Sequence, residues 1–192
     1  MGYWVIGLLV LILSLPGLAF MSIYTHEDSR VSASKWIFQN IPHNSYILSE
    51  TANVVDIPLG LPNYFLPPPE YDLKLISFDF YHMDGNPEIQ NQLFVHLVKA
   101  DYILIPSRRI FANYLRLPSR YPLTARYYDL LFSGKLGFEK VAEINSFPKL
   151  LGLSFPDEKA EETFTVFDHP VVRIYKKAKP MTEKEYRNLF KT

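Results

Sequence analysis

Five arginines with no acidic residue among them are the feature of this sequence with the clearest capacity to bind a ligand. They alternate with tyrosines and phenylalanines between Asp101 and Asp129, at Arg108, Arg109, Arg116, Arg120 and Arg126. A guanidinium pairs with two oxygens of a phosphate and stacks on aromatic rings. The pattern therefore predicts an anion-binding segment, and a solvated helical face balanced by acidic loops elsewhere is the alternative.

The apolar stretch Asp101–Pro106 comes directly before this segment and is expected to be a central strand. In open α/β sheets, ligands bind at the carboxyl ends of the strands. We therefore expect Arg108 and Arg109 to contact a phosphate or another anionic partner, while the other three arginines add a longer-range field. The competing interpretation leaves all five solvated or paired with the acidic residues from Asp157 to Glu162.

Signatures of catalysis, of a metal site and of cofactor binding are missing from the sequence. No two histidines have the H-x-x-x-H or H-E-x-x-H spacing of metal ligands, and without cysteine there are no thiolate ligands or cysteine nucleophiles. Neither a glycine-rich phosphate loop nor a G-x-S-x-G elbow occurs. The acidic pair Asp79 and Asp84 fits a strand-to-helix turn, and Glu161 and Glu162 fit a solvated acidic run. We predict no catalytic residue, no metal and no cofactor.

The composition fits one folded domain with a short appendage. The chain has 192 residues, of which 48% are hydrophobic and 21% are charged, and this balance excludes a disordered protein. The formal net charge of +0 leaves no overall basic field that would attract nucleic acid, so nucleic acid is not an expected partner.

Residues 1–24 are expected to form a single transmembrane helix. Tyr3 to Tyr24 is an uncharged run of 22 residues, and about 20 are needed to cross the hydrocarbon core of a bilayer. A cleavable signal peptide normally has Lys or Arg before its apolar run, which this sequence lacks. A buried core helix, the other alternative, is rarely apolar on all sides for this length. Basic residues beside the run are too few to indicate its direction across the membrane.

Residues 25–180 are expected to fold as an α/β domain. Thr25–Asp28 has the T-x-x-D form of a helix N-cap, and Pro42 marks the end of that helix. Three apolar strands are expected, at Ser45–Glu50, Leu73–Phe80 and Asp101–Pro106. A proline-rich loop over 51–70 separates the first two, and an amphipathic helix that starts at the turn of Gly85, Asn86 and Pro87 separates the last two. This order predicts a Rossmann-like sheet with a parallel centre.

The remaining residues are expected to add helices and antiparallel edge strands. Residues 107–132 have a helical pattern that is interrupted near Pro118 and Pro122. Three strand-like segments follow, at Phe138–Phe147, Phe164–Phe167 and Val171–Lys176. Thr182 and Glu185 form a T-x-x-E capping box, which predicts a C-terminal helix within 181–192.

Several segments resemble one family of membrane enzymes. Ala33–Ile37 (ASKWI) with Asn40–Pro42 (NIP) is similar to a helix that follows the last transmembrane helix of many multispanning glycosyltransferases. Asp56–Pro58 (DIP) resembles the loop after their next strand, and Glu161–Val172 (EETFTVFDHPVV) is similar to their E-E-T-F-T-V-Y-D-H-P-x-V ending. These features resemble the dolichyl-phosphate-mannose mannosyltransferase-like group of the GT-C class, over about 1–177. The D-H-P motif is its most specific part, and a turn explains it without a catalytic role.

The resemblance implies a function for the chain. Members of the family take a sugar from a polyprenyl-phosphate lipid, and their soluble C-terminal domain faces the extracytoplasmic side. Their catalytic carboxylate lies on an early loop between the first spans, which this sequence does not contain. We therefore expect an accessory, non-catalytic domain, with membrane lipid, a polyprenyl-phosphate sugar or a multispanning glycosyltransferase subunit as partner. The alternatives are a stand-alone membrane-anchored protein-interaction module of the cell envelope and an independent enzyme.

Overall fold

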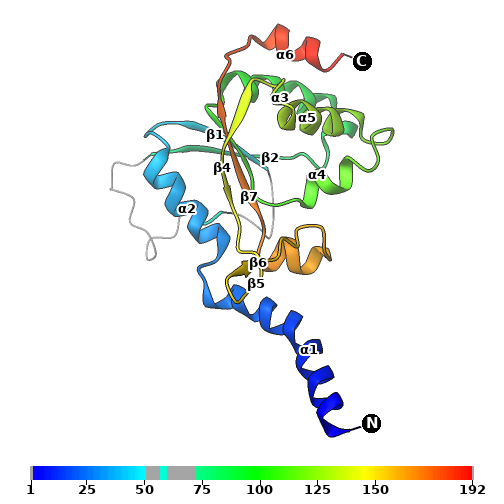
Figure 1. The fold of residues 1–192 in the computed structure, drawn as a ribbon. Coiled ribbons are helices and arrows are strands. Elements are labelled where there is room, and N and C mark those ends of the chain that lie inside the picture. Colours follow the sequence, from blue (N-terminus) through cyan, green and yellow to red (C-terminus); the bar gives the residue numbers. More distant parts are fainter. Residues whose placement is uncertain (1, 51–56, 60–71, 192) are drawn as a thin grey trace.

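The computed structural model describes residues 2–50, 57–59 and 72–191, and it shows an α/β domain from which a long N-terminal helix projects (Figure 1). Helix α1, Tyr3–Met21, has 19 residues, which is roughly 28 Å at ~1.5 Å per residue. An 18-residue window near the N-terminus has a mean hydropathy of 2.4. Of the side chains of α1, Ala19 is buried and the others are at least partly exposed. The helix is therefore long and apolar enough to cross a membrane, and its exposure contradicts the alternative of a buried core helix.

A five-stranded mixed sheet forms the centre of the domain, in the order β2-β1-β3-β7-β4. Strand β1 (Tyr46–Glu50) pairs in parallel with both β2 (Lys74–Phe78) and β3 (Tyr102–Ile105). Strand β7 (Val172–Lys177) pairs antiparallel with β3 and with the edge strand β4 (Phe138–Ile144). The predicted fold class, an α/β sheet with a parallel centre and antiparallel pairing towards one edge, is confirmed.

Helices cover both faces of this sheet (Figure 1). Helix α2 (Ser29–Asn40) lies on one face, where Ala33 and Ile37 pack against Ile47 and Ile174 of the strands. The other face is covered by helices α3, α4 and α5, at Pro87–Lys99, Arg109–Tyr114 and Pro122–Phe132, and α6 (Glu183–Leu189) packs against α3. Its core is rich in aromatic side chains, including Phe80, Tyr127, Tyr128, Phe138 and Tyr186.

Short elements connect the main ones. The 3-10 helix η1 (Ser22–Thr25) joins α1 to the domain, and η2 (Met83–Gly85) precedes α3. A hairpin of β5 (Lys149–Leu150) and β6 (Leu153–Ser154) lies next to the domain end of α1 (Figure 1). The predicted loop over 51–70 lies outside the described residues except for 57–59.

Local capping signals begin two of the helices as the sequence predicts. The Asn86 side chain accepts hydrogen bonds from the backbone N–H groups of Glu88 and Ile89, and Pro87 occupies the first position of α3. Thr182 and Glu185 form the reciprocal capping box of α6. In both cases, orphan N–H groups at the helix start receive side-chain acceptors.

Two predictions of local structure are wrong. The N-cap of α2 is Asp28, which accepts from the N–H of Arg30, whereas Thr25 lies in η1, so the T-x-x-D box does not start this helix. The segment Phe164–Phe167, predicted as a strand, belongs to the π-helix η3 (Thr163–Asp168). Its β-branched and aromatic residues favour a strand locally, but contacts with α4 hold it in a helical turn.

Candidate functional site

The arginines predicted to bind an anion do not form one cluster in the structure. Arg108, the N-cap residue of α4, donates from Nε to the Thr165 hydroxyl at 2.9 Å and from its guanidinium to the Ala160 carbonyl oxygen at 2.5 Å. Next to it, Nε of Arg109 lies 4.0 Å from a carboxylate oxygen of Glu162. The two arginines nearest the end of β3 therefore hold η3 and the residues before it against α4.

The other three arginines lie in separate places. Nε of Arg126 donates to the Leu189 carbonyl oxygen at 3.0 Å and so joins α5 to α6. The guanidinium of Arg120 lies 5.4 Å from the ring centroid of Tyr121, and Arg116 is exposed. The structure therefore does not bring the five charges together, and the anion site stays a prediction.

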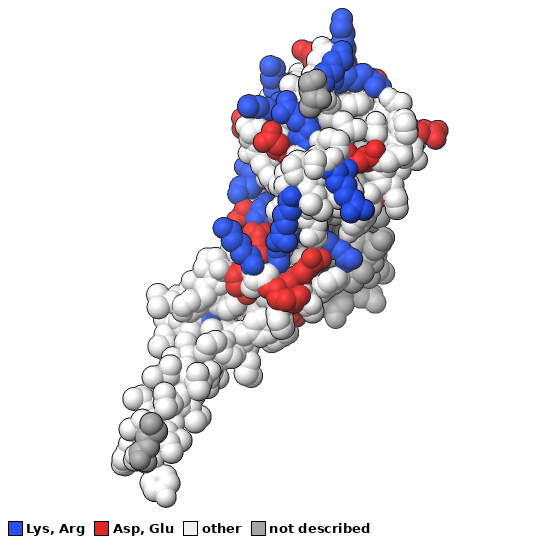
Figure 2. All heavy atoms as spheres, turned by 90° about the vertical axis from the view of Figure 1, so that its right-hand side faces the viewer, with Lys and Arg blue, Asp and Glu red and all other residues white. Residues whose placement is uncertain are grey.

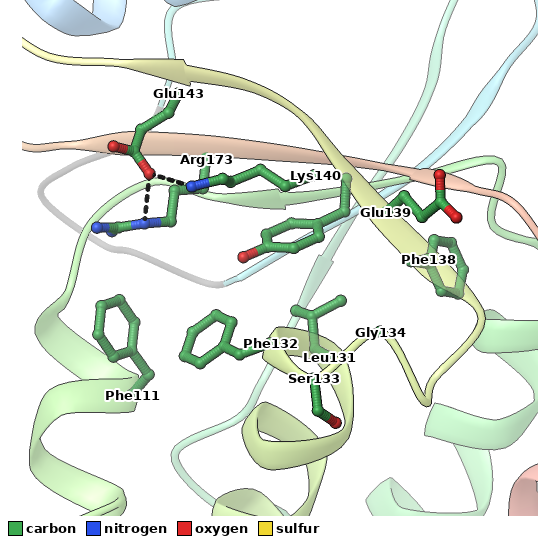
Figure 3. A pocket seen from close by; sticks show the side chains of 11 residues that line it. Phe111, Leu131, Phe132, Ser133, Gly134, Phe138, Glu139, Lys140, Glu143 and Arg173 are labelled. Carbon is green, nitrogen blue, oxygen red and sulfur yellow. Dashed lines mark hydrogen bonds and ion pairs between the residues drawn. The ribbon is translucent and has the colours of Figure 1, made fainter.

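A groove of about 590 Å³ lies between α5 and the strands β4 and β7 (Figure 3). The ring of Phe132 forms part of one wall, and Arg173 and Glu143 lie on the opposite side, with Nε 3.3 Å from a carboxylate oxygen. Arg173 also forms a two-pronged ion pair with Glu158, at 2.7 and 2.5 Å. Lys140 pairs with the same Glu143 at 2.6 Å. Both cations are thus neutralised within the protein, which favours a structural network over an anion-binding site.

The carboxyl edge of the parallel strands holds a buried acid. Glu50, the last residue of β1, is 2% exposed, and its Oε1 accepts a hydrogen bond from the Tyr128 hydroxyl at 2.5 Å. Burial raises the pKa of Glu50 to about 8, although the Tyr128 hydrogen bond and the charge of Arg173 act in the opposite direction. At neutral pH this carboxyl is therefore mostly protonated.

The position of Glu50 is the one where open α/β sheets bind ligands. Strands β2 and β3 flank β1 on opposite sides, so the strand order reverses at the end of β1. Ser107, which is 2% exposed, follows β3 at the same edge, and a pocket of about 240 Å³ has Glu50 and Ser49 in its lining. In the part of the chain that the structure describes, Tyr128 is the hydrogen-bond partner of the Glu50 carboxyl, so no acid–base pair is assembled there.

The domain end of α1 and the following η1 are fixed to the D-H-P segment. The hydroxyl of Tyr24 donates to Oδ2 of Asp168 at 2.8 Å. The ring of Phe20 stands edge-on to His169, with 5.7 Å between their centroids. His169 is 2% exposed, and its Nε2 lies 3.0 Å from a carboxylate oxygen of Asp157. These contacts involve side chains from both ends of the sequence and set the position of α1 relative to the domain.

The segments on which the expected glycosyltransferase resemblance rests meet in the folded chain. The Ser34 hydroxyl donates to the Pro58 carbonyl oxygen at 3.1 Å. The hydroxyl of Ser29, which precedes the ASKWI segment at the start of α2, donates to the Pro170 carbonyl oxygen at 2.6 Å, across 141 positions of sequence. One apolar cluster takes side chains from all of these segments: Ala33, Ile37, Ile41, Ile57 and Val172. The motif residues therefore have structural roles, since they join α2, β7 and the end of α1.

Sequence reasoning missed both Glu50 and the contact between α1 and D-H-P. A glutamate that ends the apolar run Ser45–Glu50 was a signal for the first, because the carboxyl ends of such strands bind ligands. No local signal exists for the second, since Phe20 and His169 are far apart in the sequence.

Comparison with known proteins adds no identification: the chain matches no family model, no curated protein and no solved structure.

Proposed function

We propose that this chain is a membrane-anchored, extracytoplasmic and non-catalytic domain of a glycosyltransferase that uses a polyprenyl-phosphate sugar. The observation that carries the proposal is the contact of α1 and η1 with the D-H-P segment, through Phe20 of α1 and Tyr24 of η1. A signal peptide that is cleaved makes no lasting contact with the mature domain. Docking of α1 on buried His169 therefore favours a retained anchor over a signal peptide.

The clustering of the motif segments supports the family assignment. Residues that share a structural task have a reason to occur together, and here they build the face of the sheet on which α2 lies. In this proposal the domain is held in a set orientation above the bilayer, where it shapes the access of the acceptor to a lipid-linked donor. Catalysis is carried by spans outside these 192 residues, on the same polypeptide or on a partner.

Membranes from cells with and without residues 1–192 test this proposal. Transfer of sugar from a polyprenyl-phosphate donor to its acceptor should be lost without these residues and restored by the full chain. A double variant, Phe20→Ala with Tyr24→Phe, should restore less because it removes the contacts with His169 and Asp168. The matched control, Leu9→Ala with Tyr3→Phe, makes comparable changes on exposed parts of α1 and should restore transfer fully.

Two results would contradict the proposal. Unchanged transfer in membranes that lack these residues would remove the glycosyltransferase role. Turnover by the purified chain alone would show that it is catalytic. If photocrosslinks from α1 in the native membrane join it only to envelope proteins that are not glycosyltransferases, the interaction module is the better description.

A further inference from the structure

The hairpin of β5 and β6 has a tip that exposes an apolar side chain. Leu151 is 95% exposed and has a φ of 50°, and Gly152 follows with a φ of 83°. Positive φ at both turn positions is the geometry that Asn and Gly adopt most easily, and a leucine there is strained. Leu151 gains no burial against the residues that the structure describes, so an apolar environment outside the domain would offset this strain.

The tip belongs to an apolar surface next to α1. Leu153 and Phe155 are 66% and 45% exposed, and Lys149 is the only charged residue from 149 to 155. An apolar groove of about 550 Å³ separates the hairpin from α1 and is lined mainly by Ile12, Leu15, Ala19, Phe20, Leu150 and Phe155, with Asp157 as its charged member. In Figure 2, α1 and the adjoining part of the domain are almost free of charged side chains, which gather further from the N-terminus.

The length of α1 indicates how deep this surface would lie in a bilayer. Ile12 lies nine residues before Met21, the last residue of α1, or about 14 Å at ~1.5 Å per residue. If α1 crosses a hydrocarbon core of ~30 Å, the groove lies in the leaflet next to the domain. The backbone N–H of Lys149 donates to the Ser22 hydroxyl at 2.7 Å, so the base of the hairpin is level with the end of α1. A lysine at that level can reach head-group phosphates.

We propose that the β5–β6 hairpin inserts into this leaflet beside α1, with Leu151 and Leu153 among the acyl chains and a lipid chain in the groove. The proposal rests on α1 being a retained span, as in the proposed function. The bilayer is the occupant because the surface continues the apolar surface of α1, and its two charged residues are Lys149 at the base of the hairpin and Asp157, which lines the groove and pairs with His169. The insertion makes a second membrane contact, which restricts rotation of the domain about the α1 axis.

Site-directed spin labelling of the full chain in lipid vesicles tests this proposal, because the sequence has no cysteine that would react unintentionally. Single cysteines replace Leu151 or, in a second variant, Leu153. Ile12→Cys reports on α1, and Leu117→Cys reports on an exposed leucine that follows α4 and lies away from α1. Accessibility to oxygen, which concentrates in lipid, is compared with accessibility to a water-soluble nickel complex.

Labels at 151 and 153 should resemble the label at Ile12, with oxygen accessibility above nickel accessibility, whereas the label at Leu117 should show the reverse. If the label at Ile12 lies in lipid while those at 151 and 153 are exposed to nickel, the hairpin proposal fails and the anchor stands. Low accessibility to both reagents at 151 and 153 would mean protein contact and would also overturn it. A nickel-accessible label at Ile12 would refute the span itself, and the proposed function with it.

Discussion

Replacing Glu50 with glutamine should make the stability of the protein less dependent on pH. The carboxyl of Glu50 has a pKa of about 8 in the folded protein, against an ordinary value of 4.5. Below pH 4.5 both folded and unfolded chains hold this proton. Between pH 4.5 and 8 only the folded chain holds it, so stability falls as pH rises, and above pH 8 the loss is constant.

The size of the effect follows from the difference between the two pKa values. At ~1.36 kcal/mol for each pKa unit, the shift from 4.5 to about 8 corresponds to an upper limit of roughly 5 kcal/mol. The glutamine side chain of the Glu50→Gln variant stays neutral at every pH, and its amide oxygen can accept the Tyr128 hydrogen bond. This variant should therefore be close to wild type near pH 5 and several kcal/mol more stable near pH 8.

Urea unfolding of the full chain in detergent micelles, followed by near-ultraviolet circular dichroism from about pH 5 to 8.5, measures this difference. Glu139→Gln is the matched control, since it removes a carboxylate from an exposed position of β4. Tyr128→Phe should extend the falling part of the wild-type curve to higher pH, because the Tyr128 hydrogen bond lowers the pKa of Glu50. Equal pH dependence in wild type and Glu50→Gln would refute the reasoning.

Three further predictions concern the stability of the domain and the contact of Phe20 and Tyr24 with η3. Gly137→Ala should destabilise the full chain by about 2 kcal/mol more than Gly134→Ala in urea unfolding. Both glycines have positive φ, so both variants carry backbone strain. A Cβ at Gly137 would in addition lie 2.6 Å from the Lys179 carbonyl oxygen, whereas the space at Gly134 is open. Asp84→Ala should lower the free energy of unfolding by about 1–2 kcal/mol, and Asp84→Asn should lower it less, because Asp84 accepts hydrogen bonds from the N–H groups of Leu123 and Thr124 at the start of α5. Equal losses of stability in the two variants would contradict this capping role. Phe20→Ala with Tyr24→Phe should speed amide hydrogen exchange in η3 and leave exchange in α3 unchanged. Unchanged exchange in η3 would mean that these contacts do not stabilise η3 against α1.

Part of the fold could be predicted because its signals are local. The start of α3 at Asn86-Pro87 and the capping box of α6 depend on side chains within three or four residues of the groups they bind. The apolar runs that became β1 and β3 are also short and contiguous, and the loop and helix between strands favoured parallel pairing. The uncharged run that became α1 is continuous as well, so its capacity to cross a membrane was visible without tertiary structure.

The candidate sites depended on contacts that no local pattern contains. The arginine segment was visible, but where each guanidinium points depends on η3 and α6, which follow later in the chain, as with Arg108 on Thr165. The pKa of Glu50 is set by its burial under α5 and by Tyr128, 78 positions away.

The sequence by itself determined the apolar helix, the starts of α3 and α6 and the parallel centre of the sheet, since these depend on neighbours along the chain. Tertiary structure decided that Thr163–Asp168 is helical, because Arg108 donates a hydrogen bond to Thr165. Thr165 and Val166 are both buried, whereas adjacent residues of a strand point to opposite faces. It also decided that α1 docks on His169, since burial is a sum over partners that are distant in sequence.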